Sequence, residues 1–170
     1  MAPDFEVERL GPDRSRTGDT FRLSDARGRP VGLIFGSYTW PPFREHAVRV
    51  NEIYREFREQ MDFYIVYIQE IHPTDGWQVP ANERDEVLFT QPTNADERAE
   101  MAGVCMLNLK FEMPMLLDNM ENEVDLKYAA LPERLYLVDA LGRVVYRSRM
   151  GPWGFDTEEW RAAIEGLAAG

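Results

Sequence analysis

The stretch VGLIFGSYTWPPFR, residues Val31–Arg44, sets the architecture that this chain is expected to adopt. Its first half is an apolar run typical of a buried strand, a Gly-Ser turn follows, and a Pro-Pro pair favours the start of a helix. Backbone N–H groups at such a helix start attract negative charge, including that of a thiolate. The residue at the helix mouth is Trp40. The stretch therefore predicts a strand–turn–helix unit whose usual reactive position carries an indole.

Downstream of this unit, the pattern predicts alternating helices and strands. Apolar residues recur every three or four positions from Phe43 to Met61, which predicts an amphipathic helix. The run FYIVYI, Phe63–Ile68, is typical of a strand covered on both faces. A long irregular stretch, Glu70–Thr93, follows, and loops of that length are often functional. Residues Asp96–Leu109 predict a second helix.

The remaining elements are shorter. Pro114–Asp118 predicts a strand, Glu123–Ala129 a helix, Arg134–Ser148 a hairpin, and Thr157 opens a last helix. Upstream, the alternation in residues 20–35 predicts an N-terminal hairpin that turns at residues 25–28. Residues 1–18 are polar and are expected to be loosely attached, which leaves residues 19–170 as a single domain.

This order of elements is typical of the thioredoxin-like α/β fold, with a mixed central sheet flanked by helices. A strand–helix–strand unit comes first, and a hairpin and a helix come last. In that fold the turn after the first core strand is the reactive site, and a cis proline before the third core strand lies beside it. Pro114 occupies the expected place in the sequence, so we expect a cis Met113–Pro114 bond close to the turn.

Composition narrows the possible functions. The chain has 170 residues and a formal net charge of −11, from 30 acidic and 19 basic side chains, which disfavours nucleic acid and anionic membranes as partners. No apolar run approaches the roughly 20 residues of a membrane span. The first residues lack the apolar centre of a signal peptide, so a cytoplasmic location is expected. Cys105 is the single cysteine and cannot form an internal disulfide. The two histidines, His46 and His72, have no spaced thiolates beside them, and we expect neither a metal nor a cofactor.

Several motifs in register resemble one family. They are FGSYTWPPF, YIVYIQEIHPTDGW, MPMLLDNMENEVDLKYAALPERLYLVD and GRVVYRSRMGPWGF, and they resemble the iodothyronine deiodinases, bacterial relatives included. The resemblance runs from about Val31 to Trp160. It implies a thioredoxin-like domain with a segment inserted after the second core strand, which fits Glu70–Thr93, and it implies a homodimer.

The resemblance also locates a departure from the family. The family's selenocysteine or cysteine corresponds to Trp40, and an upstream cysteine of vertebrate members corresponds to Tyr38. An indole is not a soft nucleophile, so thiol- or selenol-dependent deiodination and disulfide reduction are not expected. A second family histidine is replaced near Thr90 and Gln91. The chain is thus expected to be a pseudoenzyme with respect to the family reaction.

Other family positions are retained. By resemblance, the catalytic candidates are Tyr67, Glu70 and His72, a strand-end triplet that binds substrate and handles protons in the family. Because Glu70 and His72 are two residues apart, an extended chain would point both to one side, where the carboxylate would orient the imidazole and raise its pKa. The candidates for substrate binding line the same turn or lie close to it: Ser37, Tyr38, Thr39, Trp40, Pro114 and Arg134.

Three functions stay open. The first is binding of a small ligand, such as an aromatic acid, in the former active-site cleft. The second is an enzyme with acid–base chemistry by His72 and Glu70, with Trp40 stacking on the substrate. The third is a structural or partner-binding protein whose cleft Trp40 plugs, since an aromatic residue in such a turn is exposed unless it binds or fills something.

Overall fold

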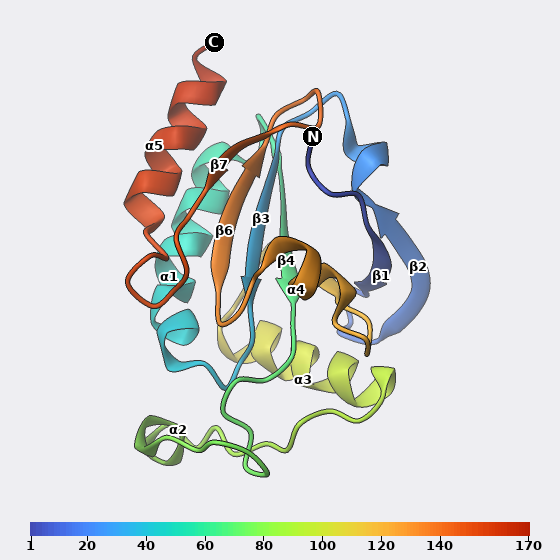
Figure 1. The fold of residues 1–170 in the computed structure, drawn as a ribbon, viewed down its shortest axis with the longest axis vertical. Coiled ribbons are helices and arrows are strands. Elements are labelled where there is room, and N and C mark those ends of the chain that lie inside the picture. Colours follow the sequence, from blue (N-terminus) through green and yellow to red (C-terminus); the bar gives the residue numbers. More distant parts are fainter.

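The computed structural model describes residues 1–170, and its centre is a seven-stranded mixed sheet with the order β2-β1-β5-β4-β3-β6-β7 (Figure 1). The strands are β1 (Glu6–Leu10), β2 (Arg16–Arg22), β3 (Val31–Gly36), β4 (Asp62–Tyr67), β5 (Met115–Leu117), β6 (Arg134–Val138) and β7 (Val144–Arg147). The helices are α1 (Pro41–Phe57), α2 (Pro80–Arg84), α3 (Ala95–Asn108), α4 (Glu123–Tyr128) and α5 (Thr157–Ala168). The predicted thioredoxin-like α/β architecture is confirmed.

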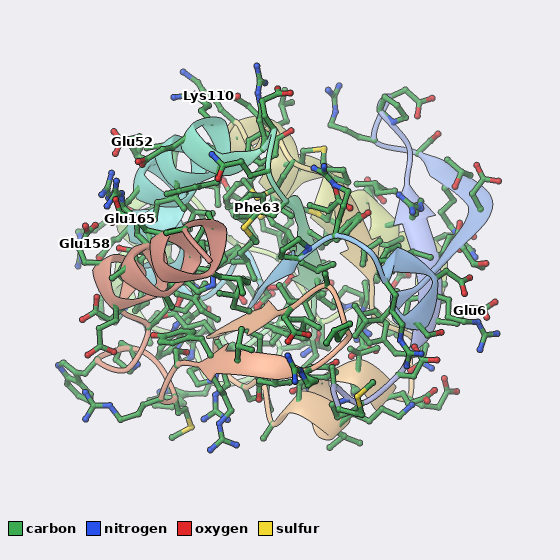
Figure 2. All side chains as sticks on the ribbon, turned by 90° about the horizontal axis from the view of Figure 1, so that it is seen from above. Glu6, Glu52, Phe63, Lys110, Glu158 and Glu165 are labelled. Carbon is green, nitrogen blue, oxygen red and sulfur yellow. The ribbon has the colours of Figure 1, made fainter.

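Helices cover both faces of the sheet. Residues of α1, α3 and α5 form one apolar cluster with the first face, and residues of α4 form a second cluster with the other. Phe63 of β4 points into the first cluster, while Glu6, Glu52 and Lys110 project outward (Figure 2). Because both faces are covered, every residue of β3 is buried, as its uninterrupted apolar run predicts.

The central strands bring the site together at one edge of the sheet. β3 and β4 are parallel, and their last residues, Gly36 and Tyr67, lie side by side. β6 is antiparallel to β3 and pairs Arg134 with Phe35, so it begins at the edge where β3 and β4 end. The turn after β3, the loop after β4 and the residues before β6 therefore meet there.

The sequence predictions for the N-terminal region were wrong. A hairpin exists, but β2 pairs with β1 and not with β3, which lies between β4 and β6. A 3₁₀ helix, Leu23–Ala26, carries the chain across to β3. Residues 1–18 are not loosely attached, because Val7 and Leu10 of β1 are buried and β1 also pairs with β5. The polar composition of this segment concealed the few apolar side chains that attach it.

The expected cis bond at Met113–Pro114 was also wrong. The cis peptide bonds are Leu131–Pro132 and Gly151–Pro152. β5 is parallel to β4 and begins inside the sheet, where the carbonyl of Pro114 accepts a hydrogen bond from the N–H of Ile65.

The strand that begins beside the reactive turn is β6, because it runs antiparallel to β3. The proline that precedes this strand is Pro132. β5 lies earlier in the chain than the hairpin of β6 and β7, and the prediction mistook it for the third core strand.

The inserted segment after β4 contains the short helix α2, which the sequence did not predict, in the lower part of Figure 1. None of the helices is of a length and apolarity that would let it cross a membrane.

Candidate functional site

The turn after β3 places an indole at the mouth of α1. Ser37 and Thr39 are completely buried, whereas Trp40 is partly exposed and packs against the first apolar cluster. Trp40 is the N-cap residue of α1 and makes no side-chain cap, and Pro41 begins the helix. The indole lies over the ring of His72, with centroids 5.4 Å apart and planes inclined by 32°.

A buried hydrogen-bond network supports the turn from below. The Tyr67 hydroxyl donates to Oε1 of Glu70 and accepts from the backbone N–H of Tyr38 at 3.0 Å. Oε2 of Glu70 accepts from the backbone N–H and the hydroxyl of Thr39, at 3.0 and 2.5 Å. The last residue of β4 and an acid three residues later thus hold the backbone of the turn.

The environment determines the charge of this network. Burial raises the pKa of Glu70, while the hydrogen bonds from Thr39 and Tyr67 and the positive charge of Arg98 act in the opposite direction. Burial raises the pKa of Tyr67 well above its usual value, and the neighbouring Glu70 adds to this increase. Tyr67 is therefore a permanent proton donor in the network, and Glu70 is the acceptor.

His72 is oriented by the inserted segment and not by Glu70. Its Nδ1 lies 2.7 Å from the carbonyl oxygen of Trp77, and because a carbonyl only accepts, Nδ1 carries the proton. On a neutral ring Nε2 is then the free nitrogen. Glu70 reaches only the backbone of His72, through the Thr39 hydroxyl, which accepts from that N–H at 3.2 Å. The expectation that the Glu70 carboxylate orients the imidazole is therefore wrong.

Gln91 and Asn82 of the inserted segment form hydrogen bonds that hold the turn and the loop after β4. The sequence did not indicate either as a site residue. The amide of Gln91 accepts from the N–H of Glu70 and donates to its carbonyl, both at 2.9 Å. The amide of buried Asn82 donates to the carbonyl of Thr39 at 2.9 Å. Two amides at this spacing in a long polar loop carry no pattern that marks them in advance.

A third missed residue is Glu133, which comes immediately before β6. It is completely buried, and neither of its carboxylate oxygens has a hydrogen-bond partner. Burial raises its pKa to about 8, the charge of Glu45 adds to this, and the nearby indole N–H of Trp40 lowers it. That N–H does not reach hydrogen-bond geometry.

Strand alternation explains why Glu133, and not Arg134, is the neighbour of Trp40. Arg134 lies opposite Phe35, which belongs to the α4 face of the sheet, so the Arg134 side chain lies on that face too. The preceding residue, Glu133, points to the face of α1. Arg134 has no acidic partner, and its buried Nε makes no hydrogen bond.

The other predicted residues have different surroundings. Tyr38 is a core residue whose hydroxyl accepts a hydrogen bond from Asn108 at 2.9 Å. The buried Ser37 hydroxyl has no partner. Pro114 lines a hollow of about 530 Å³ near Tyr54, away from the turn.

That hollow and a second one, of about 440 Å³ beside Arg98, are not lined by Trp40, His72 or Arg134. Neither hollow opens at the turn, beneath which lies the buried network of Tyr67, Glu70 and Thr39.

Three features define a thioredoxin-like protein. They are the unit of β3, the turn and α1, the antiparallel strand β6 beside β3, and Pro132 before β6. Solved structures with this fold include a putative protein disulfide isomerase from Bacteroides thetaiotaomicron (TM-score 0.66, 17% identity, 98% of this chain and 85% of that one). A putative thiol:disulfide interchange protein from Chlorobium tepidum is also similar (TM-score 0.61, 17% identity, 96% and 94%). At such identities the likeness concerns the fold alone.

The chain belongs to the iodothyronine deiodinase family, whose model matches residues 1–168. It is 37% identical over 140 residues to type I iodothyronine deiodinase of Xenopus laevis, which covers 81% of this chain and 52% of that protein. It is 33% identical over 144 residues to thyroxine 5-deiodinase of Ovis aries, covering 84% and 48%. The chain spans about half the length of these curated relatives.

Proposed function

We propose that this protein is a member of the deiodinase family that binds a small planar ligand at the mouth of α1 and has no redox nucleophile there. The observation that carries the proposal is the partly exposed indole of Trp40 over the ring of His72, above the complete network of Tyr67, Glu70 and Thr39. The network holds the backbone that presents the indole at the helix mouth.

The chemistry of the turn supports the absence of thiol chemistry. Trp40 supplies no thiolate or selenolate, and Cys105 lies on α3 with no exposed surface. Burial raises the pKa of the Cys105 thiol well above its usual value, which keeps it protonated and unreactive. We therefore expect no dithiothreitol-dependent deiodination. The variant Trp40→Cys is the positive control, because a thiol at a helix start is activated.

The groups around the mouth favour an aromatic acid as ligand. The indole face offers stacking area, Nε2 of His72 is free to bond, and Arg134 has no acidic partner at the start of β6. The ligand's ring would lie on Trp40, and a carboxylate on it would have to extend past the start of β6 to meet Arg134, which lies on the other face of the sheet.

A calorimetric and thermal-shift screen of aromatic acids tests this proposal on the wild type and on Trp40→Ala. We expect Trp40→Ala to weaken binding by about 1–3 kcal/mol, the scale of a lost stacking contact and its buried area. The matched control is Trp153→Ala, because Trp153 is 92% exposed and its loss should leave the affinity unchanged.

One observation favours a second candidate, in which Trp40 is a plug. The ring packs against the first apolar cluster, and neither of the two larger hollows reaches it. If no acid stabilises the wild type and Trp40→Ala only lowers the melting temperature, the plug is the better account. If a ligand is turned over and His72→Ala lowers kcat more than affinity, His72 is an acid–base residue and the protein is an enzyme.

A further inference from the structure

Glu133 is enclosed on every side by the parts of the chain that form the mouth of α1. The side chain points to the face of α1 and has no exposed surface. Gly151, in the loop after β7, leaves just enough room, because a Cβ atom at that position would overlap the side chain of Glu133. The partly exposed side chain of Trp40 is a further neighbour, and its N–H lies close enough to lower the pKa of the carboxyl group.

Three buried polar atoms at this point have no hydrogen-bond partner. They are both carboxylate oxygens of Glu133 and Nε1 of Trp40. Buried polar atoms without partners are uncommon in folded proteins, and each such group calls for an explanation. Here the unpartnered acid and the unpartnered N–H belong to adjacent side chains.

The charged groups named for this region do not balance the negative charge that Glu133 would carry as a carboxylate. α1 contributes Glu45, which has the same sign. Arg134 of β6 lies on the opposite face of the sheet, and the loop after β7 places Gly151 against the side chain. A carboxylate has about four acceptor sites, and only the indole N–H faces it.

We propose that Glu133 is a positioning residue for Trp40: its uncharged carboxyl seats the indole over the helix mouth, and loss of its proton releases the ring. The inference concerns the ring alone and holds whether or not the mouth binds a ligand. It therefore goes beyond the proposed function.

Release, and not a tighter contact, follows from the balance of opposing effects. A charged acceptor would strengthen an interaction with the indole N–H, and this effect does lower the pKa of Glu133. Burial outweighs it, because the pKa of the seated arrangement still lies near 8. Above that pH the carboxylate gains more from water than from one N–H. Because Glu133 has no exposed surface, water reaches it only when a neighbour moves, and Trp40, which is already partly exposed, is the neighbour that we expect to move.

¹⁹F NMR of the protein labelled with 5-fluorotryptophan measures this directly. The chain has four tryptophans, and Trp40→Phe assigns the signal of Trp40. We expect that signal to shift as the pH rises, with a midpoint no higher than about 8, because release of the ring lowers the apparent pKa below that of the seated arrangement. Trp160 is the internal control, since it is completely buried and its indole donates to the carbonyl of Tyr136 at 3.1 Å.

Two variants separate positioning from a merely structural role. Glu133→Gln keeps the size and the uncharged state, so the Trp40 signal should stay at its low-pH position throughout the titration. Glu45→Gln changes an exposed residue and removes a like charge, so it should lower the midpoint by a fraction of a pH unit. This second variant gives an answer even if Glu133→Gln does not fold.

A Trp40 signal that does not move with pH in the wild type would overturn the inference. So would a shift of equal size and midpoint in Glu133→Gln, or a midpoint that Glu45→Gln leaves in place.

Discussion

Removing one oxygen atom from the floor of the site should cost the protein a large share of its stability. In Tyr67→Phe the ring and its packing remain, but Oε1 of Glu70 loses its donor and the N–H of Tyr38 loses its acceptor. Tyr67 has no exposed surface and Glu70 is 4% exposed, so water does not replace the lost hydroxyl. Each of the two buried partners left unsatisfied costs about 1–3 kcal/mol, which gives a loss of roughly 2–6 kcal/mol.

Urea denaturation and calorimetry measure the loss. For a chain of this length, at about 2–4 °C per kcal/mol, the expected fall in melting temperature is roughly 4–24 °C. Tyr54→Phe is the control, because the ring of Tyr54 packs edge-on against that of Phe63 but its hydroxyl makes no hydrogen bond within the protein. If the two variants lose the same stability, the hydroxyl of Tyr67 does not support the turn and the reasoning about the network fails.

Two further predictions concern other contacts of the same region. Folded Glu133 keeps its proton up to a pH of about 8, whereas the unfolded chain loses it near 4.5, so this residue destabilises the fold progressively as pH rises between those values, by at most about 5 kcal/mol. The stability of Glu133→Gln relative to the wild type should therefore increase from pH 5 to 8 in urea titrations. A difference in stability that is constant with pH would contradict this. At Gly36 a Cβ atom would overlap the ring of Phe43, so Gly36→Ala should lose about 1–3 kcal/mol of stability by overpacking. Gly166 lies in open space on α5, so Gly166→Ala should gain up to about 1 kcal/mol of stability from helix propensity. Thermal melts that rank the two variants in the reverse order would refute the packing argument.

Local patterns predicted those parts of the fold that local physics determines. α1 buries one face, which requires apolar residues every three or four positions, and β4 is buried along almost all of its length, which requires an uninterrupted apolar run. Both patterns are visible in the sequence, so both elements could be predicted. The pairing of β1 with β2, and the place of β6 beside β3, depend on contacts between distant residues that one sequence does not display.

The same limit applied to the site. Tyr67, Glu70 and Thr39 were named through a family resemblance, and the structure does bring them together. Glu133 was missed because its importance depends on which face of the sheet it points to, and that depends on where β6 begins. The residue after it, Arg134, was instead predicted to bind substrate, because it corresponds to a substrate-binding arginine of the family.

Several contacts that hold the turn are made to its main chain and not to its side chains. Asn82 donates to the backbone carbonyl of Thr39, and Arg44, at the start of α1, donates to the carbonyl of Tyr38 while it pairs with Asp85 of the insertion. Main-chain contacts of this kind do not depend on which side chain stands at position 40, whereas the ring of His72 and the carboxyl group of Glu133 do lie against it. A different side chain at position 40 would therefore leave these main-chain contacts in place, which makes the position a convenient one at which to install a reactive group.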